Sequence, residues 1–370
     1  MRLPKSSAAL LGISALLALP AAIAAERVQV VTSFSILADM VESVGGEHVD
    51  VTSLVGPDSD AHVYSPTPRD ARALTDADLV VFNGLLFEGW MERLIDSSDY
   101  AGPLVTATDG IDKLEYRGQD DEHAHGHDDH DDHGHDDHGH DDHGHDDHGH
   151  DDHGHDDHGH DDHGHDNDHD HGDYDPHAWQ DLAMGKVYVA NIRDGLIEAD
   201  PDNAEAYTAN AQRYINEIDA TDAEIRALLT EVPSGSSVIT GHDSFGYFAS
   251  AYGLRFLSPV GLSTEAEPSA ANMARLIDVI REQNVQALFH ENMTSPAIIN
   301  QLAEETGLTV AGTLYADALA SEGEASTYLG MMRHNAQILH DALAAPDHDD
   351  HGHGHDHDDH GHDDDHGHSH

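Results

Sequence analysis

Two segments of the chain alternate short apolar runs with helical patterns, which is typical of parallel β-α-β units. In the first segment the pattern predicts strands over residues 28–31, 49–55, 79–82 and 104–106. It predicts helices over residues 36–44, 68–74 and 87–95. Thr67 precedes the second helix as a candidate N-cap, and Gly45-Gly46 ends the first.

The second segment repeats this arrangement. Strands are predicted over residues 237–240, 256–260, 287–289 and 309–311, and helices over 245–252, 270–283, 296–306 and 326–343. Between the segments lie two predicted helices, 184–198 and 203–229, of which the second is long for a globular protein. The predicted fold class is α/β, with two doubly wound parallel-sheet lobes joined by a long rigid helix.

The N-terminus has the pattern of a secretory signal. Arg2 and Lys5 precede an apolar stretch over residues 8–19, and Ala22-Ile23-Ala24 is a small-residue cleavage site. The apolar stretch is too short and too rich in alanine for a membrane span. We therefore expect an exported protein, cleaved near Ala24 and located in the periplasm. The chain has no cysteine, which excludes disulfides and thiolate metal sites.

Histidine is concentrated in two low-complexity tracts. Twenty of the 37 histidines lie between His123 and His171, around six consecutive HDDHG units, and ten more lie between His348 and His370. Imidazole and carboxylate are ligands of divalent transition metals, so the tracts indicate metal binding. Three roles stay open: buffering zinc for a tighter site, scavenging zinc when it is scarce, or a drifting repeat without a selected role.

The tracts also divide the chain. They contain almost no apolar side chains and repel themselves electrostatically, so we predict that they are disordered. The predicted divisions are a signal peptide (1–24), an N-terminal lobe (25–119), a His/Asp-rich insertion (120–173), the end of the N-terminal lobe (174–202), a linking helix (203–230), a C-terminal lobe (231–345) and a His/Asp-rich tail (346–370).

The formal net charge of −57 limits the partners. Removing the 32 acids of the two tracts still leaves 41 acidic against 16 basic residues. Nucleic acids and anionic membrane surfaces are therefore excluded as favourable partners, whereas cations are favoured. We expect a monomer.

Four residues outside the tracts are candidate metal ligands. His62 lies in GPDSDAHVYSPTPRD, His177 in YDPHAW, His242 in ITGHDSFGYF and Asp317 in GTLYADALASEGEASTY. At least three follow the carboxyl ends of predicted strands, where open α/β sheets place ligands. Three imidazoles and one carboxylate form an N₃O set that suits tetrahedral Zn²⁺. We predict that two facing lobes bring the four residues together in an interlobe cleft.

These motifs resemble the solute-binding proteins of metal-transporting ABC importers, the cluster A-I group that captures zinc or manganese in the periplasm. The resemblance covers nearly all of the chain after the signal and includes the linking helix and the His-rich insertion. It implies that His62, His177, His242 and Asp317 are the ligands and that an inner-membrane ABC permease receives the metal. A periplasmic zinc chaperone is a further expected partner.

The resemblance also bears on which metal is bound. Manganese-specific members have a carboxylate at the position of His242, and Mn²⁺ prefers oxygen ligands, so this chain is predicted to bind Zn²⁺. Some zinc-specific relatives lack the final aspartate, whereas Asp317 is present here. Glu265 and Glu267 resemble an acidic loop near the cleft that contacts the permease, although a solvated loop explains them equally well.

Three other readings compete with zinc capture. A manganese receptor would share the fold. A zinc hydrolase would need an open coordination position and a general base, and the chain has no His-Glu-x-x-His motif. A metal-storage protein would explain the tracts but not the four motifs. The remaining histidines (His48, His290, His334 and His340) are predicted to be structural, and Glu291 to be a supporting or surface acid.

Overall fold

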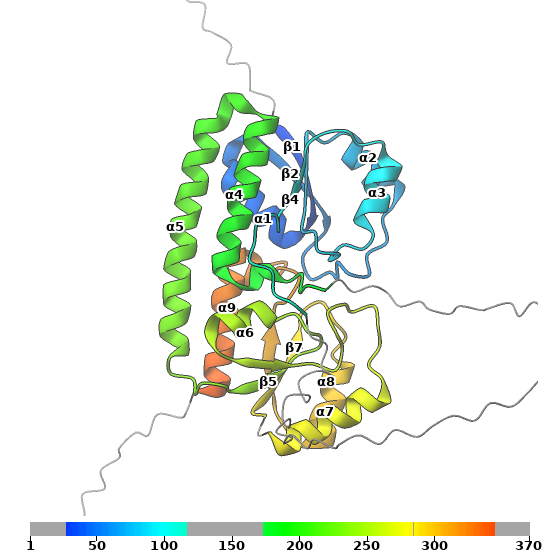
Figure 1. Cartoon of the computed structure of the whole chain (residues 1–370), viewed down its shortest axis with the longest axis vertical. Helices are drawn as coiled ribbons and strands as arrows, with labels where there is room; N and C mark the ends of the chain where they lie inside the picture. Colours follow the sequence, from blue (N-terminus) through cyan, green and yellow to red (C-terminus); the bar gives the residue numbers. More distant parts are fainter. Residues whose placement is uncertain (1–26, 117–172, 284, 345–370) are drawn as a thin grey trace, which may run out of the picture.

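The computed structural model describes residues 27–116, 173–283 and 285–344. The predicted signal peptide, the His-rich tail and all of the predicted insertion except Asp173 lie outside these residues. Within them the structure consists of two α/β lobes, one above the other in Figure 1.

Each lobe contains one four-stranded parallel sheet. The first sheet has the order β2-β1-β3-β4, and its strands are β1 (Val28–Phe34), β2 (Val49–Val55), β3 (Leu79–Phe82) and β4 (Leu104–Thr106). The second has the order β6-β5-β7-β8, with β5 (Ser237–Ile239), β6 (Arg255–Leu257), β7 (Ala287–Glu291) and β8 (Val310–Leu314). The two lobes therefore repeat the same strand order, and the predicted fold class is confirmed.

The helices follow the predicted positions closely. The first lobe contains α1 (Ser35–Gly45), α2 (Pro68–Thr75) and α3 (Met91–Ser98), and the second contains α6 (Gly246–Tyr252), α7 (Ala270–Glu282) and α8 (Ala297–Thr306). Thr67 caps α2 through a capping box with Asp70, so that the segment between β2 and α2 has a fixed end.

One predicted helix start is wrong. The apolar pattern placed a helix over residues 87–95, but α3 begins only at Met91. Leu85 and Leu86 have left-handed backbone angles, with φ of 53° and 62°, which helical residues do not adopt. The next residues turn so that the buried Glu88 carboxylate accepts hydrogen bonds from the backbone N–H of Asn83 and the Ser33 hydroxyl.

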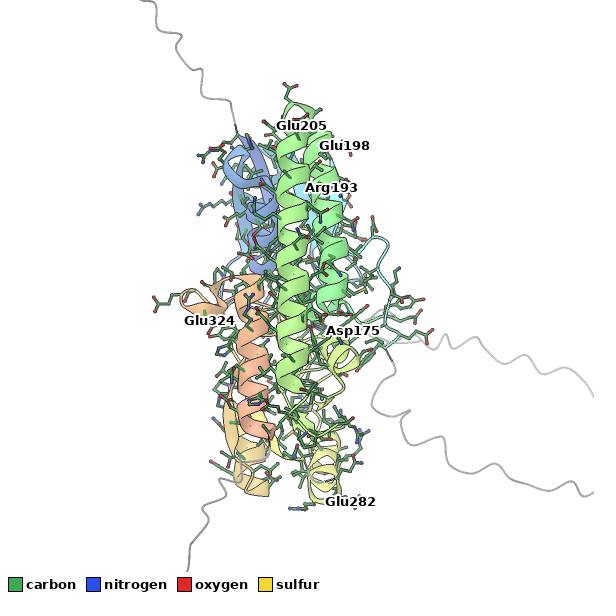
Figure 2. The ribbon with its side chains drawn as sticks, turned by 90° about the vertical axis from the view of Figure 1, so that its left-hand side faces the viewer. Asp175, Arg193, Glu198, Glu205, Glu282 and Glu324 are labelled. Atoms are coloured by element: carbon green, nitrogen blue, oxygen red, sulfur yellow. The ribbon has the colours of Figure 1, made fainter. Side chains whose placement is uncertain are left out.

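Three long helices run beside the lobes. These are α4 (Leu182–Ala199), α5 (Ala204–Leu229) and α9 (Tyr328–Leu343). With 26 residues, α5 is about 39 Å long and passes along both lobes, flanked by α4 and α9 (Figures 1 and 2). Its apolar face is buried, which confirms that a long helix joins the lobes.

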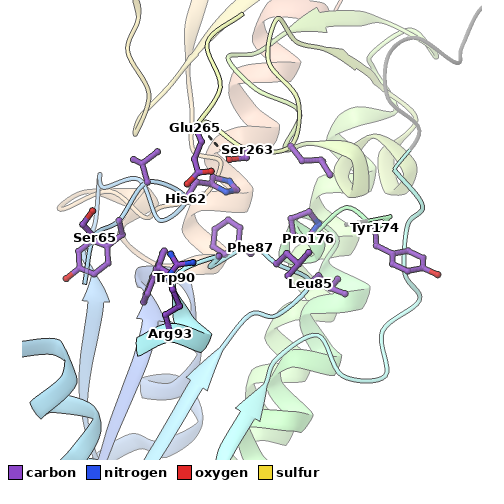
Figure 3. Close-up of a pocket in the computed structure, with 15 residues that line it drawn as sticks. His62, Ser65, Leu85, Phe87, Trp90, Arg93, Tyr174, Pro176, Ser263 and Glu265 are labelled. Atoms are coloured by element: carbon purple, nitrogen blue, oxygen red, sulfur yellow. Dashed lines mark hydrogen bonds between the residues drawn. The ribbon is translucent and has the colours of Figure 1, made fainter. Parts of the chain in front are cut away.

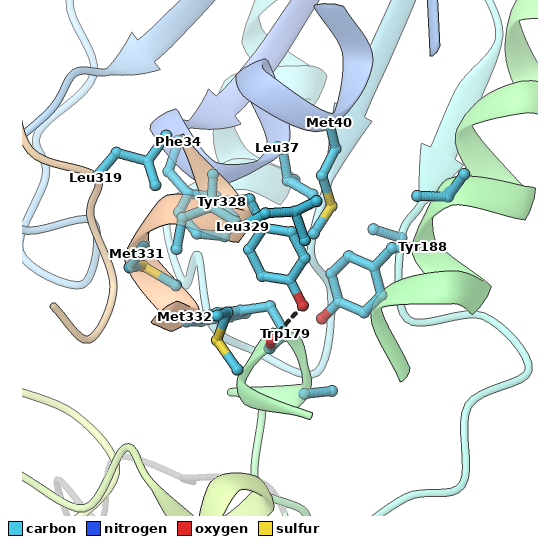
Figure 4. Packing of buried hydrophobic residues seen from close by; sticks show 14 of the residues in the cluster. Phe34, Leu37, Met40, Trp179, Tyr188, Leu319, Tyr328, Leu329, Met331 and Met332 are labelled. Atoms are coloured by element: carbon cyan, nitrogen blue, oxygen red, sulfur yellow. Dashed lines mark hydrogen bonds between the residues drawn. The ribbon is translucent and has the colours of Figure 1, made fainter. Parts of the chain in front are cut away.

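The main core lies where these helices meet the first sheet. Figure 4 shows Phe34 of β1, Leu37 and Met40 of α1, Trp179, and Tyr328 of α9 packed together. The Tyr328 hydroxyl donates a hydrogen bond of 2.6 Å to the Trp179 carbonyl. Trp179 belongs to a short 3₁₀ helix, η3 (Ala178–Gln180), directly after His177. The packing therefore fixes the segment that carries this histidine.

A smaller second core lies between β5, β7, α7 and α8 and includes Ile239, Leu276, Leu288 and Leu302. Among the described residues, no helix combines the length and apolarity needed to cross a bilayer.

Candidate metal centre

The four predicted ligands come together between the lobes. His62 lies in the segment between β2 and α2, His242 follows β5, Asp317 follows β8, and His177 precedes η3. One ligand atom from each of the four lies within 4.8 Å of all the others. Nε2 of His62, His242 and His177 lies 3.2, 3.0 and 3.6 Å from the nearer Asp317 carboxylate oxygen. The prediction that these four residues come together between the lobes is confirmed.

The facing atoms are buried and have no hydrogen-bond partner. This holds for Nε2 of all three histidines and for both carboxylate oxygens of Asp317. Buried polar atoms without partners are costly and rare, so five of them facing one another indicate a ligand between them. In tetrahedral zinc with bonds of 2.0–2.1 Å, ligand atoms are about 3.3 Å apart. The three distances to the Asp317 carboxylate and the donor set both fit a transition-metal cation.

Two buried carboxylates orient two of the imidazoles. Asp175 Oδ1 lies 2.7 Å from His177 Nδ1 and also accepts the His177 backbone N–H. Glu291 Oε2 lies 2.7 Å from His242 Nδ1, and Oε1 accepts the backbone N–H groups of Gly241 and His242. With Nδ1–H donating to a carboxylate, the Nε2 lone pair of each ring points into the centre.

His62 is held differently. In the described part of the chain, the only carboxylate paired with its side chain is Asp317. Its ring packs edge-on against Phe87 with centroids 4.7 Å apart, and its backbone N–H donates to Asp60 Oδ1. The preceding carbonyl, that of Ala61, accepts a hydrogen bond from the Trp90 indole.

The charges within the centre shift the pKa values of its members in different directions. Burial raises the pKa of Asp317, but the neighbouring His242 and His177 outweigh burial and hold that pKa well below its usual range. Burial lowers the pKa of His62. Burial also opposes protonation of His242, but Glu291 and Asp317 outweigh it and raise the pKa of this imidazole well above its usual value. A cation therefore competes with a proton for the His242 imidazole.

A cleft of about 490 Å³ leads to this centre from the solvent (Figure 3). Phe87, Trp90 and Glu265 line it, and His62 is the one candidate ligand in its lining. The described parts of the chain therefore place His62 on the solvent side of the centre and the other three ligands behind it.

The structure also shows where the remaining histidines and the supporting acids lie. His48, His290, His334 and His340 lie away from the centre, with contacts to Tyr207, Asn300, the Thr313 carbonyl and Glu231 respectively. Glu291 is a buried support and not a surface acid. Sequence reasoning missed Asp175, although its position two residues before His177 repeats the spacing of Asp60 and His62. Both aspartates accept the backbone N–H of the following histidine.

Comparison with known proteins gives one family and many relatives. Residues 30–342 match the family model described as zinc-uptake complex component A, periplasmic. The manganese-binding lipoprotein MntA of Halalkalibacterium halodurans is 28% identical over 321 residues, which cover 86% of this chain and 89% of the relative. The iron-binding protein YfeA of Yersinia pestis is 29% identical over 313 residues, covering 83% and 84%.

Solved structures share the fold. The periplasmic zinc-binding protein TroA of Treponema pallidum superimposes with a TM-score of 0.69 at 24% identity, covering 86% of this chain and all of that protein. The manganese-bound S38A mutant of a periplasmic metal-binding protein from Candidatus Liberibacter asiaticus gives a TM-score of 0.67 at 26% identity, covering 86% and 100%.

Proposed function

Because this chain belongs to the zinc-uptake complex component A family, we propose that it captures Zn²⁺ between its lobes and delivers it to an ABC permease. The family consists of metal-binding receptors of ABC uptake systems, and its members are not enzymes. The ligands in this proposal are His62, His177, His242 and Asp317. The location is the periplasm, which the family description and the signal-like N-terminus both favour.

The observation that carries the proposal is the convergence of three unpartnered imidazole nitrogens on one buried carboxylate. This N₃O set suits Zn²⁺, whereas Mn²⁺ prefers carboxylate, carbonyl and water oxygens. The names of the relatives do not decide the metal, since they include manganese, iron and zinc. Zinc is proposed here from the donor atoms of this chain.

The site also favours capture over catalysis. A catalytic zinc keeps a coordination position open for water, whereas four protein ligands would fill the tetrahedral shell. The four side chains are at most 4% exposed, so a bound ion would be shielded from solvent.

The rim of the cleft is a candidate permease contact. Glu265 lines the cleft, and both Glu265 and Glu267 are exposed. The described residues that flank the His-rich insertion lie near the same cleft, because the Tyr116 N–H donates to the Asp173 carbonyl and Tyr174 lines the cleft. We include in the proposal that the two His-rich tracts bind zinc weakly as a buffer or scavenger.

Native mass spectrometry tests the proposed cargo. A chain lacking both His-rich tracts is titrated with Zn²⁺ and with Mn²⁺, together with a His242→Ala variant and a His290→Ala control. We expect one zinc per chain that manganese does not displace, lost in H242A and kept in H290A. Tight manganese binding would favour a manganese receptor. Metal binding only in the presence of the tracts would favour storage.

A further inference from the structure

The segment that carries His62 is attached to the second lobe through Asp58. One carboxylate oxygen of Asp58 accepts a hydrogen bond from the Asn292 amide at 3.0 Å, and the other accepts the Ser321 backbone N–H at 3.0 Å. The Asp58 backbone N–H donates to the Leu319 carbonyl at 2.9 Å. Asn292 follows β7, and Leu319 and Ser321 follow β8, so all three contacts cross from the first lobe to the second.

Asp60 makes a further crossing two residues later. Its Oδ2 accepts a hydrogen bond of 2.7 Å from the Thr264 hydroxyl, and its Oδ1 accepts the His62 backbone N–H at 2.9 Å. Thr264 lies in the loop after β6. One carboxylate thus connects the backbone of a proposed ligand to the opposite lobe.

The Asp58 contacts depend on its charge and backbone conformation. Burial raises the pKa of Asp58, but the hydrogen bonds from Asn292 and Ser321 outweigh burial and hold that pKa below its usual range. The side chain is therefore a carboxylate at neutral pH and accepts from two obligate donors. Its φ of 52° is left-handed, a conformation that asparagine and aspartate tolerate better than other side chains.

The other ligands do not depend on these contacts. His242 and Asp317 belong to the second lobe, and the segment after His177 is attached to the Asp317 loop, because the Trp179 indole and the Gln180 amide both donate to the Ala316 carbonyl. His177 is held by both lobes, because the Asn83 amide also donates to the Pro176 carbonyl at 2.9 Å, so the contacts of Asp58 and Asp60 act on the position of His62.

We propose that Asp58 and Asp60, with their partners Asn292, Ser321 and Thr264, form an interlobe latch that sets the rate of metal release. The latch rests on the proposed function, since it acts by holding His62 against the metal. Asp58 and Asp60 are positioning residues and do not touch the ion. Breaking the latch increases the dissociation rate of zinc, and the association rate changes little.

Tryptophan fluorescence of the full chain measures this rate. The two tryptophans of the sequence, Trp90 and Trp179, adjoin the centre, and the Trp179 ring lies 5.3 Å from His177. The His-rich tracts contain no tryptophan, so zinc bound there is not detected. Protein loaded with one equivalent of zinc is mixed with excess chelator, and the dissociation rate is read from the change in emission.

Two substitutions break the latch at separate points. Asp58→Asn places an amide N–H against one of its two donors, the Asn292 amide or the Ser321 backbone N–H. Thr264→Val removes the hydroxyl that donates to Asp60. Each is expected to increase the dissociation rate about fivefold, equivalent to ~1 kcal/mol for one hydrogen bond, and the pair about twentyfold. Asp50→Asn is the matched control, because Asp50 is exposed on β2 and the charge change is the same.

An exchange of partners separates the latch from a general effect on folding. In the double variant D58N/N292D the donor and acceptor of this pair are reversed, while the hydrogen bond from the Asn292 amide to the Ala318 carbonyl is lost. The double variant should therefore release zinc more slowly than N292D alone. A double variant that releases zinc as fast as N292D or faster would overturn the latch. Rates of D58N and T264V equal to that of D50N would also overturn it.

The failure of the latch and that of the proposed function are distinguishable. If the wild-type chain shows no zinc-dependent emission and binds no zinc once the tracts are removed, the proposed function fails and the latch with it. If the wild type binds one zinc but the latch variants release it at the control rate, the latch alone fails. The melting temperatures of the metal-free D58N and T264V variants should lie within about 2–4 °C of that of D50N, as the loss of one hydrogen bond implies.

Discussion

His177 and His242 are each oriented by a buried carboxylate on Nδ1, whereas His62 is positioned through its backbone and through contacts between the lobes. Asp175 and Glu291 lie behind the first two rings, and both are nearly inaccessible to solvent. The contact between Asp58 and Asn292 is more exposed. Two of the proposed histidine ligands are therefore fixed by a carboxylate on the ring itself, whereas the position of His62 depends on contacts between the lobes.

The two kinds of support affect different properties of the site, namely the affinity for the metal and the rate of its release. The carboxylates behind His177 and His242 fix the orientation of these rings, so they act on metal affinity. The contacts of Asp58 and Asp60 exist only while the lobes are together, so they act on the lifetime of the closed site. A receptor that must bind tightly and still deliver its cargo benefits from having both kinds of support.

Removal of a ligand is the largest change. His242→Ala takes away a donor atom and leaves Glu291 and Asp317 buried without the imidazole between them. We expect zinc affinity to fall by more than the 10–100-fold typical for the loss of a supporting residue. Competition with a chelating indicator measures the affinity, and His290→Ala should match the wild type. Equal affinities for H242A and the wild type would contradict the proposed ligand set.

The second largest effect is expected when a supporting carboxylate is neutralised, and its size should differ between Glu291 and Asp175. Glu291 uses both oxygens as acceptors, so Glu291→Gln places an N–H against a donor. Asp175 accepts both hydrogen bonds from His177 on Oδ1 alone, so an amide oxygen can replace it in Asp175→Asn. We expect about 100-fold weaker zinc binding in E291Q and about tenfold in D175N. The opposite order would refute this account of the two supports.

The histidines also differ in how they respond to pH. Glu291 and Asp317 outweigh burial and raise the pKa of His242 well above its usual value, whereas burial lowers the pKa of His62. Zinc binding should release about one proton, and affinity should fall about tenfold per unit as the pH drops below the raised pKa of His242. Calorimetry in buffers of different ionisation enthalpy counts the proton. An affinity that stays flat between about pH 5 and 7.5 would contradict this.

The smallest effect is expected at the end of the His62 segment. Thr67→Ala removes the N-cap of α2, which should lower the free energy of unfolding by ~1 kcal/mol. Zinc affinity should remain within about twofold of the wild type, since the latch and the Trp90 contact position His62. Thermal unfolding and indicator competition measure the two quantities. A large loss of affinity would mean that the helix cap, not the latch, positions this ligand.

Sequence reasoning reached the fold because the determining patterns are local. The strand β2 and the Thr67 cap were predicted correctly from alternation and capping chemistry. The start of α3 was missed because the left-handed Leu85 and Leu86 are fixed by the buried Glu88, which depends on tertiary contacts.

The site was predictable to a similar extent. The four proposed ligands lie in recognisable motifs, three of them after strands, and the sequence indicates Glu291 as a supporting or surface acid. The roles of Asp58 and Asp60 could not be predicted, because their partners Asn292 and Thr264 are more than 200 residues away along the chain. Asp175 had a local signal, namely its spacing before His177, that was not used.

X-ray absorption at the zinc edge tests the central claim most directly. The chain lacking both His-rich tracts is loaded with one equivalent of zinc and compared with His62→Ala in the same background, so that no imidazole of the tracts can replace His62. We predict four ligands at about 2.0–2.1 Å, three of them imidazoles, and a decrease to two imidazoles in H62A. An octahedral shell, or an imidazole count that does not change in H62A, would contradict a zinc centre built from His62, His177, His242 and Asp317.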